Sequence, residues 1–599
     1  MKRIFAIAML LSLTLSLSLF PSAAETSDSG QIDQLTVAIG SDQGPLTPFS
    51  GCSTKSWELH GLVYDNLYEM DTHRVLQPSL ATSYEVSEDY TVYTFHLRDD
   101  VKWHDGEQFT SEDVKFSYEL AANVVNSVNF TAPAQTIQTI NTPDPYTVEF
   151  VFEEPRSEEI MDILFGYMPI VAEHVYAGLT NDEIAANTAL AIGTGPYKVV
   201  DMKPEEYYHL EANEEYFGGT PVAKELIMPV ILDRNSAMTA LKAHQIDAMA
   251  AEIPAEMMDQ FRSDDSLAVL EGTGFSSTLL FLNESRAPFD VKEVRQAISY
   301  AINTQELVDV ILLGRGTVAS PGFVNPNDKL YNPETPAHEY NPEKAKELLD
   351  QVGFVDVDGD GFRENEEGEP VALEILVSSS KSTTIRAAEL IGEYLGEIGL
   401  NAKSTVLESG MLDTLVAPNW DGVEDGDYDM CLWGWGDVFM TTPARYVEQF
   451  HSDPTYGPSN LTRIKEPEMD AILERIRTSL SFEERDKAVD EMQIYLADHV
   501  TMVPLYFADI GFAYDPSAFD GWKMTDGRGI VTKRSLVYMN DLGTDDQAAD
   551  QPASSTGDQS STEPEYTQSK GNNTGIFIFA GVIVVAIIVI VVLTKKKKK

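Results

Sequence analysis

The chain has 599 residues, more than a single hydrophobic core accommodates, so its length predicts several domains. A hydrophobic content of 43% and a charged content of 23% are typical of a folded globular protein and exclude a disordered or fibrous one. The formal net charge of -54 repels nucleic-acid phosphates and anionic lipid headgroups, so neither is expected as a partner.

The N-terminus has the pattern of a secretory signal peptide. Lys2 and Arg3 precede an apolar stretch at 4–20, and small residues follow up to Ala24. A basic region, a short apolar region and small residues in this order predict a signal peptide at 1–24, cleaved after Ala24. An N-terminal anchor helix is the alternative. No cysteine follows the apolar stretch, which excludes a lipid anchor of the bacterial lipoprotein type.

The chain has two cysteines, Cys52 and Cys431, separated by most of its length. Two cysteines so placed form neither a disulfide framework nor a cysteine-based metal site. One bridge between them and two buried free thiols are both compatible with the sequence.

The first part of the body predicts strands followed by a helix. Residues 34–39 have a short strand pattern. Residues 91–98 alternate with period two and place three apolar side chains on one face of a half-buried strand: Tyr93, Phe95 and Leu97. Thr110 followed by Asp113 resembles a capping box, which predicts that a helix begins there.

Two later segments have helical spacing of apolar residues. They lie at 294–302 and 385–398, and the second meets Gly399, a suitable left-handed cap, before a strand that runs to Val406. Strands that alternate with helices predict an α/β fold. Several lobes of that class leave clefts between them, where small ligands usually bind.

An acidic segment at 356–367 (DVDGDGFRENEE) has the spacing of a calcium loop. Positions 1, 3 and 5 are aspartates, position 6 is glycine, position 7 offers a backbone carbonyl and position 12 is glutamate; these are Asp356, Asp358, Asp360, Gly361, Phe362 and Glu367. Oxygen ligands at these spacings wrap a hard cation, so the pattern predicts a structural calcium site between a helix and a strand. A surface turn rich in Gly and Asp, without metal, is the alternative.

The C-terminal end predicts a stalk and a membrane anchor. Residues 543–574 contain almost no large apolar side chains, which is typical of a flexible stalk. The apolar run at 575–594 predicts a transmembrane helix, because its uncharged part reaches roughly 28 Å at 1.5 Å per residue. The lysines at 595–599 are expected in the cytoplasm, which places the body at 25–542 outside the cell.

Four sequons are compatible with export: Asn129, Asn283, Asn460 and Asn572. An exported body, a stalk, one C-terminal span and no lipoprotein cysteine together suggest an archaeal surface protein.

From about residue 35 to 539 the chain resembles the family 5 solute-binding proteins, which serve peptide, dipeptide and nickel ABC importers. The segments that carry the resemblance, in family order, are LVYDNLYEMD at 62–71, the stretch from PSLATSYEV to VKFSYE at 78–119, GTGPYKVV at 193–200, NEEYFGG at 213–219, LNESRAPFDVKEVRQAISYAIN at 282–303, YNPEKAKELLDQVGF at 340–354 and YLGEIGL at 394–400. The stretch at 78–119 is the most diagnostic. The order and spacing of these segments make coincidence remote.

The resemblance implies a multi-lobed α/β fold of the periplasmic-binding-protein type. A first lobe is expected at about 33–77, 193–282 and 503–540, with an inserted lobe at 78–192 and a third at 283–502. It implies that ligand is trapped when the lobes close about a hinge. The closed form is then presented to a membrane permease with an ATPase, both on separate chains.

The resemblance also implies where the ligand binds. The segment at 430–443 (MCLWGWGDVFMTTP) matches the family region that lines the cleft on the third lobe. Asp437 fits the aspartate that pairs with a peptide's α-ammonium group, although its spacing from the next proline departs from the family pattern. Trp433 and Trp435 are predicted apolar walls. The alternative is that both tryptophans are core and Asp437 caps a turn. The loop at 45–53 is a second expected contact.

Other classes of function have less support. The histidines at 60, 104, 209 and 451 have no paired spacing that indicates a nickel site, although a chelated metal needs few protein ligands. No G-x-S-x-G, H-E-x-x-H or P-loop motif supports an exported hydrolase. The tail after 594 is too short for a signalling domain, which disfavours a sensor. The chain is therefore expected to import peptides, without catalysis and without a required cofactor, with a nickel chelate or another small solute as the alternative ligand.

Overall fold

The computed structural model describes residues 31–41, 46–49, 57–71, 75–123, 131–156, 164–186, 191–365, 368–417, 426–436, 440–525 and 529–539. The chain divides into two units, 1–540 and 541–599, and the described residues all belong to the first. The predicted signal peptide, stalk, membrane helix and lysine tail (1–24, 543–574, 575–594 and 595–599) lie outside the described residues. Among the helices that are described, none is long and apolar enough to cross a membrane.

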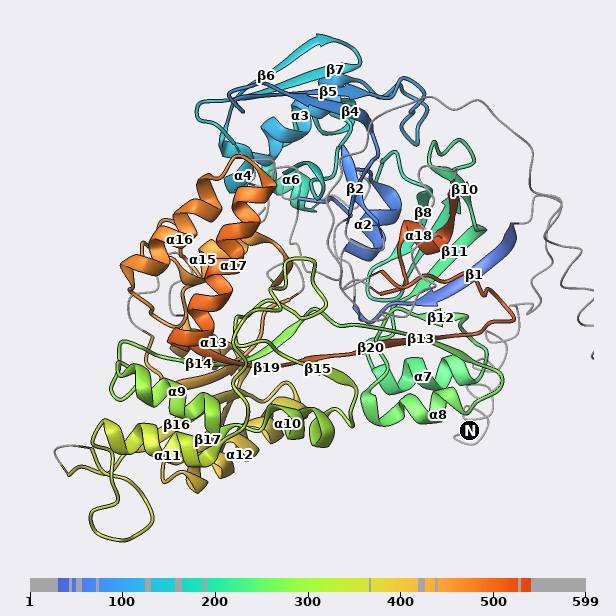
Figure 1. Ribbon diagram of the computed structural model, residues 1–599. Coiled ribbons are helices and arrows are strands. Elements are labelled where there is room, and N and C mark those ends of the chain that lie inside the picture. Colours follow the sequence, from blue (N-terminus) through green and yellow to red (C-terminus); the bar gives the residue numbers. More distant parts are fainter. Residues whose placement is uncertain are drawn as a thin grey trace, which may run out of the picture. The chain divides into compact units, whose positions relative to one another are not determined.

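The first sheet has seven strands in the order β13-β20-β12-β1-β11-β9-β8. Their bounds are β1 Ile32–Ala38, β8 Tyr197–Lys203, β9 Tyr207–Ala212, β11 Ala223–Pro229, β12 Ala248–Met249, β13 Ala268–Gly272 and β20 Ile510–Tyr514. β1 runs parallel to both of its neighbours, whereas the other pairs are antiparallel. β1 confirms the strand predicted at 34–39. The helices α7 Arg234–Lys242 and α8 Met258–Arg262 lie beside this sheet (Figure 1) and pack on Met249 and Ala513.

The second sheet is inserted between β3 and β8 and has four antiparallel strands, in the order β4-β5-β7-β6. Their bounds are β4 Ala81–Val86, β5 Val92–Leu97, β6 Ile137–Asp144 and β7 Thr147–Phe152. Tyr93, Phe95 and Leu97 are buried, which confirms the predicted strand and its inward face. Phe95 lies at the centre of an aromatic cluster with Phe150 and Phe165. Shorter helices accompany this sheet: α4 Thr131–Gln135, α5 Glu173–Tyr176 and α6 Asn181–Ala186.

The capping box predicted at Thr110 is confirmed. Helix α3 (Ser111–Ala121) follows Thr110, whose backbone N–H donates to the carboxylate of Asp113 at 2.9 Å. Asp113 also accepts from the backbone N–H of Glu173 at 3.0 Å, so the cap joins α3 to the first residue of α5. Burial raises the pKa of Asp113 despite these hydrogen bonds.

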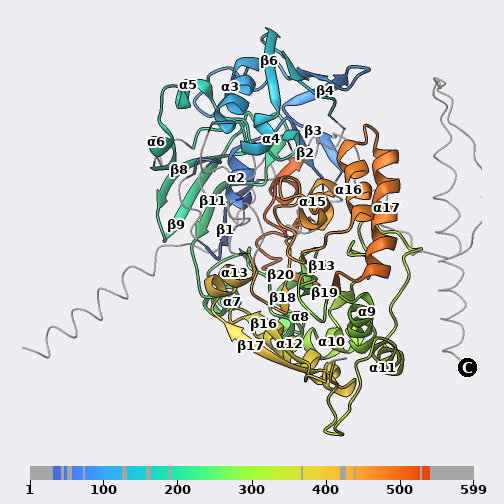
Figure 2. The ribbon, with the colours of Figure 1, turned by 90° about the vertical axis from the view of Figure 1, so that its left-hand side faces the viewer.

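The third sheet has six strands in the order β15-β19-β14-β18-β16-β17. Their bounds are β14 Ser277–Leu282, β15 Gly316–Val318, β16 Ala372–Ser378, β17 Asn401–Leu407, β18 Met430–Trp433 and β19 Met502–Ala508. One face packs on α9 Lys292–Ala301, α10 Thr304–Ile311, α11 Pro342–Gln351 and α12 Ser382–Glu397. The other face packs on α13 Ser409–Val416, α15 Pro443–Phe450, α16 Pro467–Thr478 and α17 Phe482–His499 (Figures 1 and 2).

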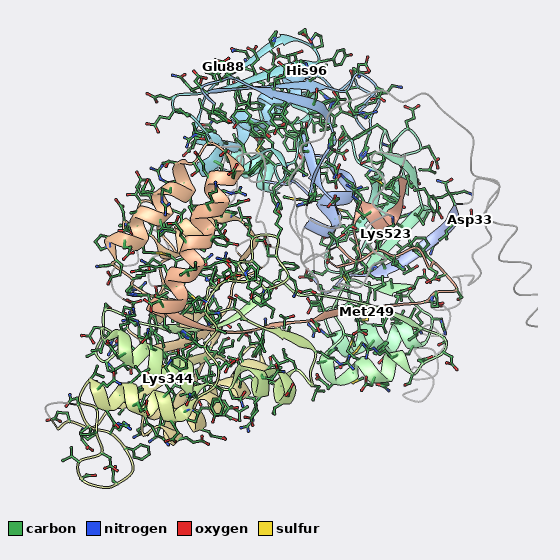
Figure 3. All side chains as sticks on the ribbon, in the orientation of Figure 1. Asp33, Glu88, His96, Met249, Lys344 and Lys523 are labelled. Carbon is green, nitrogen blue, oxygen red and sulfur yellow. The ribbon has the colours of Figure 1, made fainter. Side chains whose placement is uncertain are left out.

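The helices predicted at 294–302 and 385–398 are confirmed as α9 and α12. Gly399 follows α12 with a φ of 86°, the left-handed conformation that ends the helix before β17. On α11, Lys344 lies with its ammonium group 3.8 Å from the ring centre of Tyr300 (Figure 3). This contact ties α11 to α9.

The apolar cores show which parts of the body pack together. The seven-stranded and four-stranded sheets share one continuous apolar cluster, together with α2 Trp57–Val63. The six-stranded sheet has two clusters of its own, one on each face. The inserted sheet is therefore packed firmly against the first sheet, whereas the third is a separate packing unit.

The chain crosses twice between the seven-stranded and six-stranded sheets, at 273–276 and at Asp509. β14 lies inside the six-stranded sheet, between β19 and β18. The expected lobe boundaries placed 277–282 and 503–508 in the first lobe. Their hydrogen bonds place them in the third instead, because β14 and β19 pair with each other and not with β13 or β20.

Two short two-stranded sheets complete the body. β2 Tyr68–Met70 pairs with β3 Leu76–Pro78, and β10 Gly219–Pro221 pairs with β21 Val537–Met539. The chain enters β21 from helix α18 (Lys533–Leu536). Lys533 is buried, and its ammonium group lies 2.5 Å from the carboxylate of Asp65 and 3.0 Å from the carbonyl of Tyr64. Burial alone lowers the pKa of Lys533, but Asp65 and Glu69 raise it above its ordinary value.

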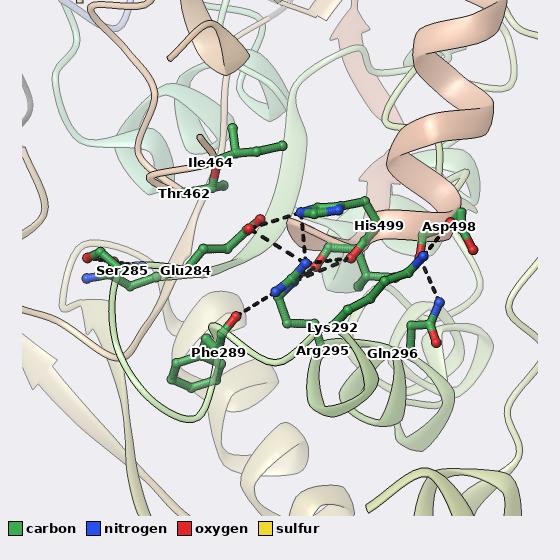
Figure 4. A network of polar contacts seen from close by, with 12 residues as sticks. Glu284, Ser285, Phe289, Lys292, Arg295, Gln296, Thr462, Ile464, Asp498 and His499 are labelled. Atoms are coloured by element: carbon green, nitrogen blue, oxygen red, sulfur yellow. Dashed lines mark hydrogen bonds and ion pairs between the residues drawn. The ribbon is translucent and has the colours of Figure 1, made fainter. Parts of the chain in front are cut away.

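A second buried network fixes the start of the third lobe (Figure 4). Arg295 on α9 donates to the carbonyls of Phe289 at 2.7 Å and Val500 at 3.0 Å. Its guanidinium also lies 2.8 Å from Nε2 of His499, which in turn lies 3.0 Å from Glu284. The network joins α9 to the end of α17 and to the loop after β14.

The structure changes the interpretation of two sequons and one cysteine. Asn283 and Asn460 are buried, and their side-chain amides donate to backbone carbonyls, so neither nitrogen is accessible for glycosylation in the folded protein. Cys431 is a buried free thiol whose pKa is raised by burial. Cys52, Asn129 and Asn572 lie outside the described residues.

Candidate functional site

The segment predicted to line the ligand cleft begins in β18 and continues through Gly436. β18 runs antiparallel to β14 and parallel to β16, at the middle of the six-stranded sheet. Cys431 and Trp433 face the cluster formed with α13 and α15–α17, whereas Met430 and Leu432 face α9–α12. Alternation along a strand thus directs Trp433 toward the α15–α17 side of the sheet.

The backbone after β18 is held against the start of β14. The N–H of Ser277 donates to the carbonyl of Trp435 at 3.0 Å, and the N–H of Trp435 donates to the hydroxyl of Ser277 at 3.0 Å. A Cβ on Gly434 would overlap the carbonyl oxygen of Ser277, so only glycine allows this approach. Ser277 follows directly on the crossing at 273–276, so the predicted ligand segment adjoins the connection between the sheets.

The two predicted tryptophans have different environments. Trp435 is buried, with 7% of its surface exposed, and its ring lies edge-on to Phe281 at 6.5 Å between centroids. Trp433 is half-buried and packs on the edge of the same apolar cluster. Trp435 therefore contributes to the core, and Trp433 is the more accessible of the two. Asp437 lies outside the described residues.

Only residues 46–49 of the second expected contact, the loop at 45–53, are described. Leu46, Thr47 and Phe49 are buried there. The hydroxyl of Tyr64 donates to the carbonyl of Leu46 at 2.9 Å, which fastens the loop to the residue after α2.

The acidic segment lies between α11 and β16, and residues 356–362 form an exposed turn there. Each aspartate accepts hydrogen bonds from backbone N–H groups ahead of it: Asp356 from Gly359 and Gly361, Asp358 from Asp360, and Asp360 from Phe362, at 2.7–3.1 Å. One carboxylate oxygen from each of the three aspartates lies within 4.8 Å of the others. Among the described residues, these three carboxylates are the group close enough together to hold a metal ion. Glu367, the predicted position 12, lies outside them.

Sequence reasoning missed the two residues that contact Trp435 in the predicted ligand segment, Ser277 and Phe281. The pairing of β14 with β18 joins residues more than 140 positions apart, and no local pattern records it. One signal was available: the alternating glycines of 432–436 (LWGWG) are typical of a close approach by another backbone.

The comparisons with known proteins agree with this architecture. The chain matches the family described as bacterial extracellular solute-binding proteins, family 5 Middle, over residues 75–457. The chain belongs to this family. The match extends over more than half of the 599 residues, and the family consists of extracellular binding proteins of transport systems.

Relatives in the family differ in what they bind. The oligopeptide-binding protein AppA of Bacillus subtilis is 26% identical over 551 residues, which cover 88% of this chain and 98% of AppA. Heme-binding protein A of Haemophilus influenzae is 26% identical over 471 residues, which cover 75% of this chain and 82% of that protein.

Solved structures show the same fold. AppA in complex with a nonapeptide is similar with a TM-score of 0.67 and 23% identity, covering 84% of this chain and 98% of AppA. NikZ from Campylobacter jejuni in complex with Ni(L-His) is similar with a TM-score of 0.67 and 25% identity, covering 84% of this chain and 97% of NikZ. The body is therefore a periplasmic-binding-protein-like α/β fold, whose sheets position β18 beside the crossing between lobes.

Proposed function

We propose that this protein captures peptides outside the cell by lobe closure and delivers them to an ABC permease with its ATPase. The observation that carries the proposal is the similarity to an oligopeptide-binding protein along 88% of this chain. Two strand crossings between separately packed lobes provide the hinge that such capture needs. The lobes are the seven-stranded sheet, the four-stranded insert, and the six-stranded sheet with β14 and β19 included.

In the ligand-bound form, Asp437 pairs with the peptide's α-ammonium group and Trp433 forms part of an apolar wall. The position of Asp437 directly after 434–436 supports this assignment, because that backbone is fixed to Ser277 at the hinge. A carboxylate that becomes buried on closure needs a cationic partner, and a peptide N-terminus supplies one. Trp435 supports the wall from within the core.

The protein is exported and remains attached to its membrane in this proposal. The support is the signal-peptide pattern at 1–24, the apolar run at 575–594 and the lysines at 595–599. The segment at 543–574 then acts as a stalk that keeps the body near the permease. Such a C-terminal anchor in place of a lipid anchor is the arrangement expected of an archaeal surface protein.

A structural calcium ion is proposed for the acidic turn. The support is the convergence of Asp356, Asp358 and Asp360, whose negative charges repel one another unless a cation lies between them. The carbonyl of Phe362 and the carboxylate of Glu367 would complete the ligand set. Thermal unfolding should move to higher temperature as Ca²⁺ replaces a chelator, and Asp358→Asn should abolish the shift. An equal shift in wild type and variant would exclude this site.

The ligand is best identified by native mass spectrometry of the purified full-length protein, followed by denaturation and analysis of what is released. A mixture of short peptides is expected. A single metal chelate or a heme would replace the peptide proposal but retain the importer. Retention of no solute, together with no thermal shift on adding a peptide mixture, would contradict capture itself.

Asp437→Ala should then weaken peptide capture by about tenfold or more, because a charge-assisted hydrogen bond is lost. Asp427→Asn is the matched control, since Asp427 is an exposed aspartate of the same lobe that pairs with Arg286. Equal affinities for the Asp437→Ala variant and the wild type would remove Asp437 from the site.

A further inference from the structure

The first and third lobes are joined by two short chain segments in close contact, one between β13 and β14 and one between β19 and β20. At Gly274 the crossing at 273–276 lies against Ala508 and Ile510, so tightly that a Cβ on Gly274 would overlap the carbonyl oxygen of Ala508. The N–H of Asp509 donates to the carbonyl of Arg315 at 3.2 Å. The turn before β15 is thereby fastened to the hinge strand.

Arg315 is the point where the third lobe meets charged groups of the first. Its guanidinium lies 2.5 Å from the carboxylate of Asp259, on α8, and 3.5 Å from that of Glu271, on β13. Arg315 itself lies between α10, which packs on the six-stranded sheet, and β15, which is a strand of that sheet. Arg315 and Glu271 are 17% and 29% exposed, so solvent screens this pair less than a surface ion pair, whereas Asp259, at 85%, is open to solvent.

Among the described residues, no other cation of the third lobe contacts Asp259 or Glu271. Arg262, on α8, also contacts both carboxylates, at 2.6 Å to Glu271 and 3.7 Å to Asp259, but it belongs to the same lobe as they do. Asp509 lies close by in the hinge strand, and burial and then the charge of Glu271 raise its pKa. Without Arg315, the carboxylates of Asp259, Glu271 and Asp509 would have, of the described cations, only Arg262 beside them, and no ion pair with Asp259 or Glu271 would join the two lobes here.

The apolar clusters do not provide this connection. Within the described part of the chain, no buried apolar cluster contains residues of both lobes. Two clusters consist of residues from the first lobe and its insert, and the two clusters of the six-stranded sheet consist of residues from the third lobe. The ion pairs of Arg315 join the two sides of the hinge. They therefore give different lobe arrangements different free energies.

We propose that Arg315 is a hinge clamp that holds the first and third lobes in the arrangement described, through Asp259 and Glu271, and thereby sets how readily they rearrange. The inference rests on the proposed function insofar as that function requires lobe closure. It gives the binding equilibrium a salt dependence that is intrinsic to the hinge and independent of the ligand's charge. Any solute that favours a different arrangement must do so against the clamp.

The test is an electron-spin distance measurement on the full-length, solute-free protein. Spin labels are placed at Leu232→Cys on the first lobe and Met411→Cys on the third, which are 69% and 57% exposed. Cys52→Ser removes the other site for labelling, because Cys431 is buried. Distance distributions are recorded for the parent protein and for Arg315→Gln, Arg315→Lys and Arg286→Gln, at roughly 50 mM and 500 mM salt.

In Arg315→Gln the main population at low salt should fall by about two- to fivefold relative to other distances, and added salt should change it little further. Arg315→Lys should restore part of the effect, since it keeps one charge without the planar fork. Arg286→Gln is the control, because Arg286 pairs with Asp427 and Asp429 within the third lobe. A distribution in Arg315→Gln identical to that of the parent would overturn the clamp.

This experiment tests the clamp and the proposed function by different measurements. Distances in the solute-free protein test the clamp whatever the solute is. Addition of a mixture of short peptides to the same labelled protein tests capture. If peptides leave every distribution unchanged while Arg315→Gln still shifts it, the clamp holds and peptide capture does not.

Discussion

At the scale of single residues, two backbone groups select one form of His104. The N–H of Gly193 donates to Nδ1 of His104 at 3.2 Å, and Nε2 lies 3.0 Å from the carbonyl of Gly195. Nε2 therefore carries the hydrogen and Nδ1 the lone pair. Burial lowers the pKa of His104 to about 4, because the charged ring loses its hydration. A second proton on Nδ1 would also replace the hydrogen bond that Nδ1 accepts from the N–H of Gly193.

This environment predicts an acid-dependent loss of stability. The pKa of His104 in the folded protein lies below its ordinary value of 6.5, so its contribution is complete above pH 6.5 and is lost as pH falls toward 4. The loss should reach at most about 3 kcal/mol of unfolding free energy. Urea unfolding at several pH values should show a shallower decline for His104→Gln than for wild type over this range. Parallel curves would contradict the assignment.

The buried guanidinium of Arg295 gives a second prediction at this scale. Arg295→Ala leaves the carbonyls of Phe289 and Val500 without their donor and Glu284 without its cation. The free energy of unfolding should fall by about 3–5 kcal/mol. Arg286→Ala, which removes an arginine with 42% of its side chain exposed, should cost about 1 kcal/mol or less. Equal losses for Arg295→Ala and Arg286→Ala in urea unfolding would show that the burial of Arg295 does not increase its contribution to stability.

At the scale of elements, the two chain segments that cross between the lobes can approach each other closely because residue 274 is glycine. Gly274→Ala would force its methyl group into the carbonyl of Ala508, so the strands must separate. A loss of about 2 kcal/mol or more is expected, as for overpacking in a tight core. Gly396→Ala, in α12, meets no atom within 4 Å and should be neutral or stabilise the protein by up to about 1 kcal/mol. Thermal unfolding of both variants is the measurement. Equal destabilisation of the two would show that the contact of Gly274 with Ala508 is not the cause.

At the scale of the whole molecule, Lys533 connects the end of the body to its beginning. Asp65 receives the ammonium group of Lys533 together with the hydroxyls of Thr194 and Tyr216, so three distant segments meet at one carboxylate. β21 then pairs with β10 on the same lobe. The first lobe is thus closed by the last described residues of the chain.

Lys533→Met should reduce the free energy of unfolding by about 3–5 kcal/mol, because it leaves a buried carboxylate without its partner. Lys523→Met is the matched control: Lys523 is an exposed lysine of the same C-terminal segment (Figure 3) and should change stability by about 0.5 kcal/mol or less. Tryptophan fluorescence in urea is a suitable readout. A loss below about 1 kcal/mol for Lys533→Met would mean that the ion pair does not hold this segment.

Local patterns along the chain determined much of the secondary structure. Tyr93, Phe95 and Leu97 alternate as a strand with one buried face must, and Thr110 with Asp113 starts a helix through bonds between near neighbours. Gly399 ends α12 because glycine, which has no Cβ, readily adopts the left-handed conformation. Family membership also followed from the order of sequence segments, because each segment carries its own pattern.

Tertiary structure alone decided which residues far apart in the sequence contact each other. Asn283 and Asn460 satisfy the sequon pattern, yet folding buries both; Trp435 has the composition of a pocket wall, yet it packs on Phe281. The partners of Arg315 lie 56 and 44 positions away, and the partner of Lys533 lies 468 positions away. Ionic and steric contacts of this kind depend on distance in space, which the sequence encodes only through the complete fold.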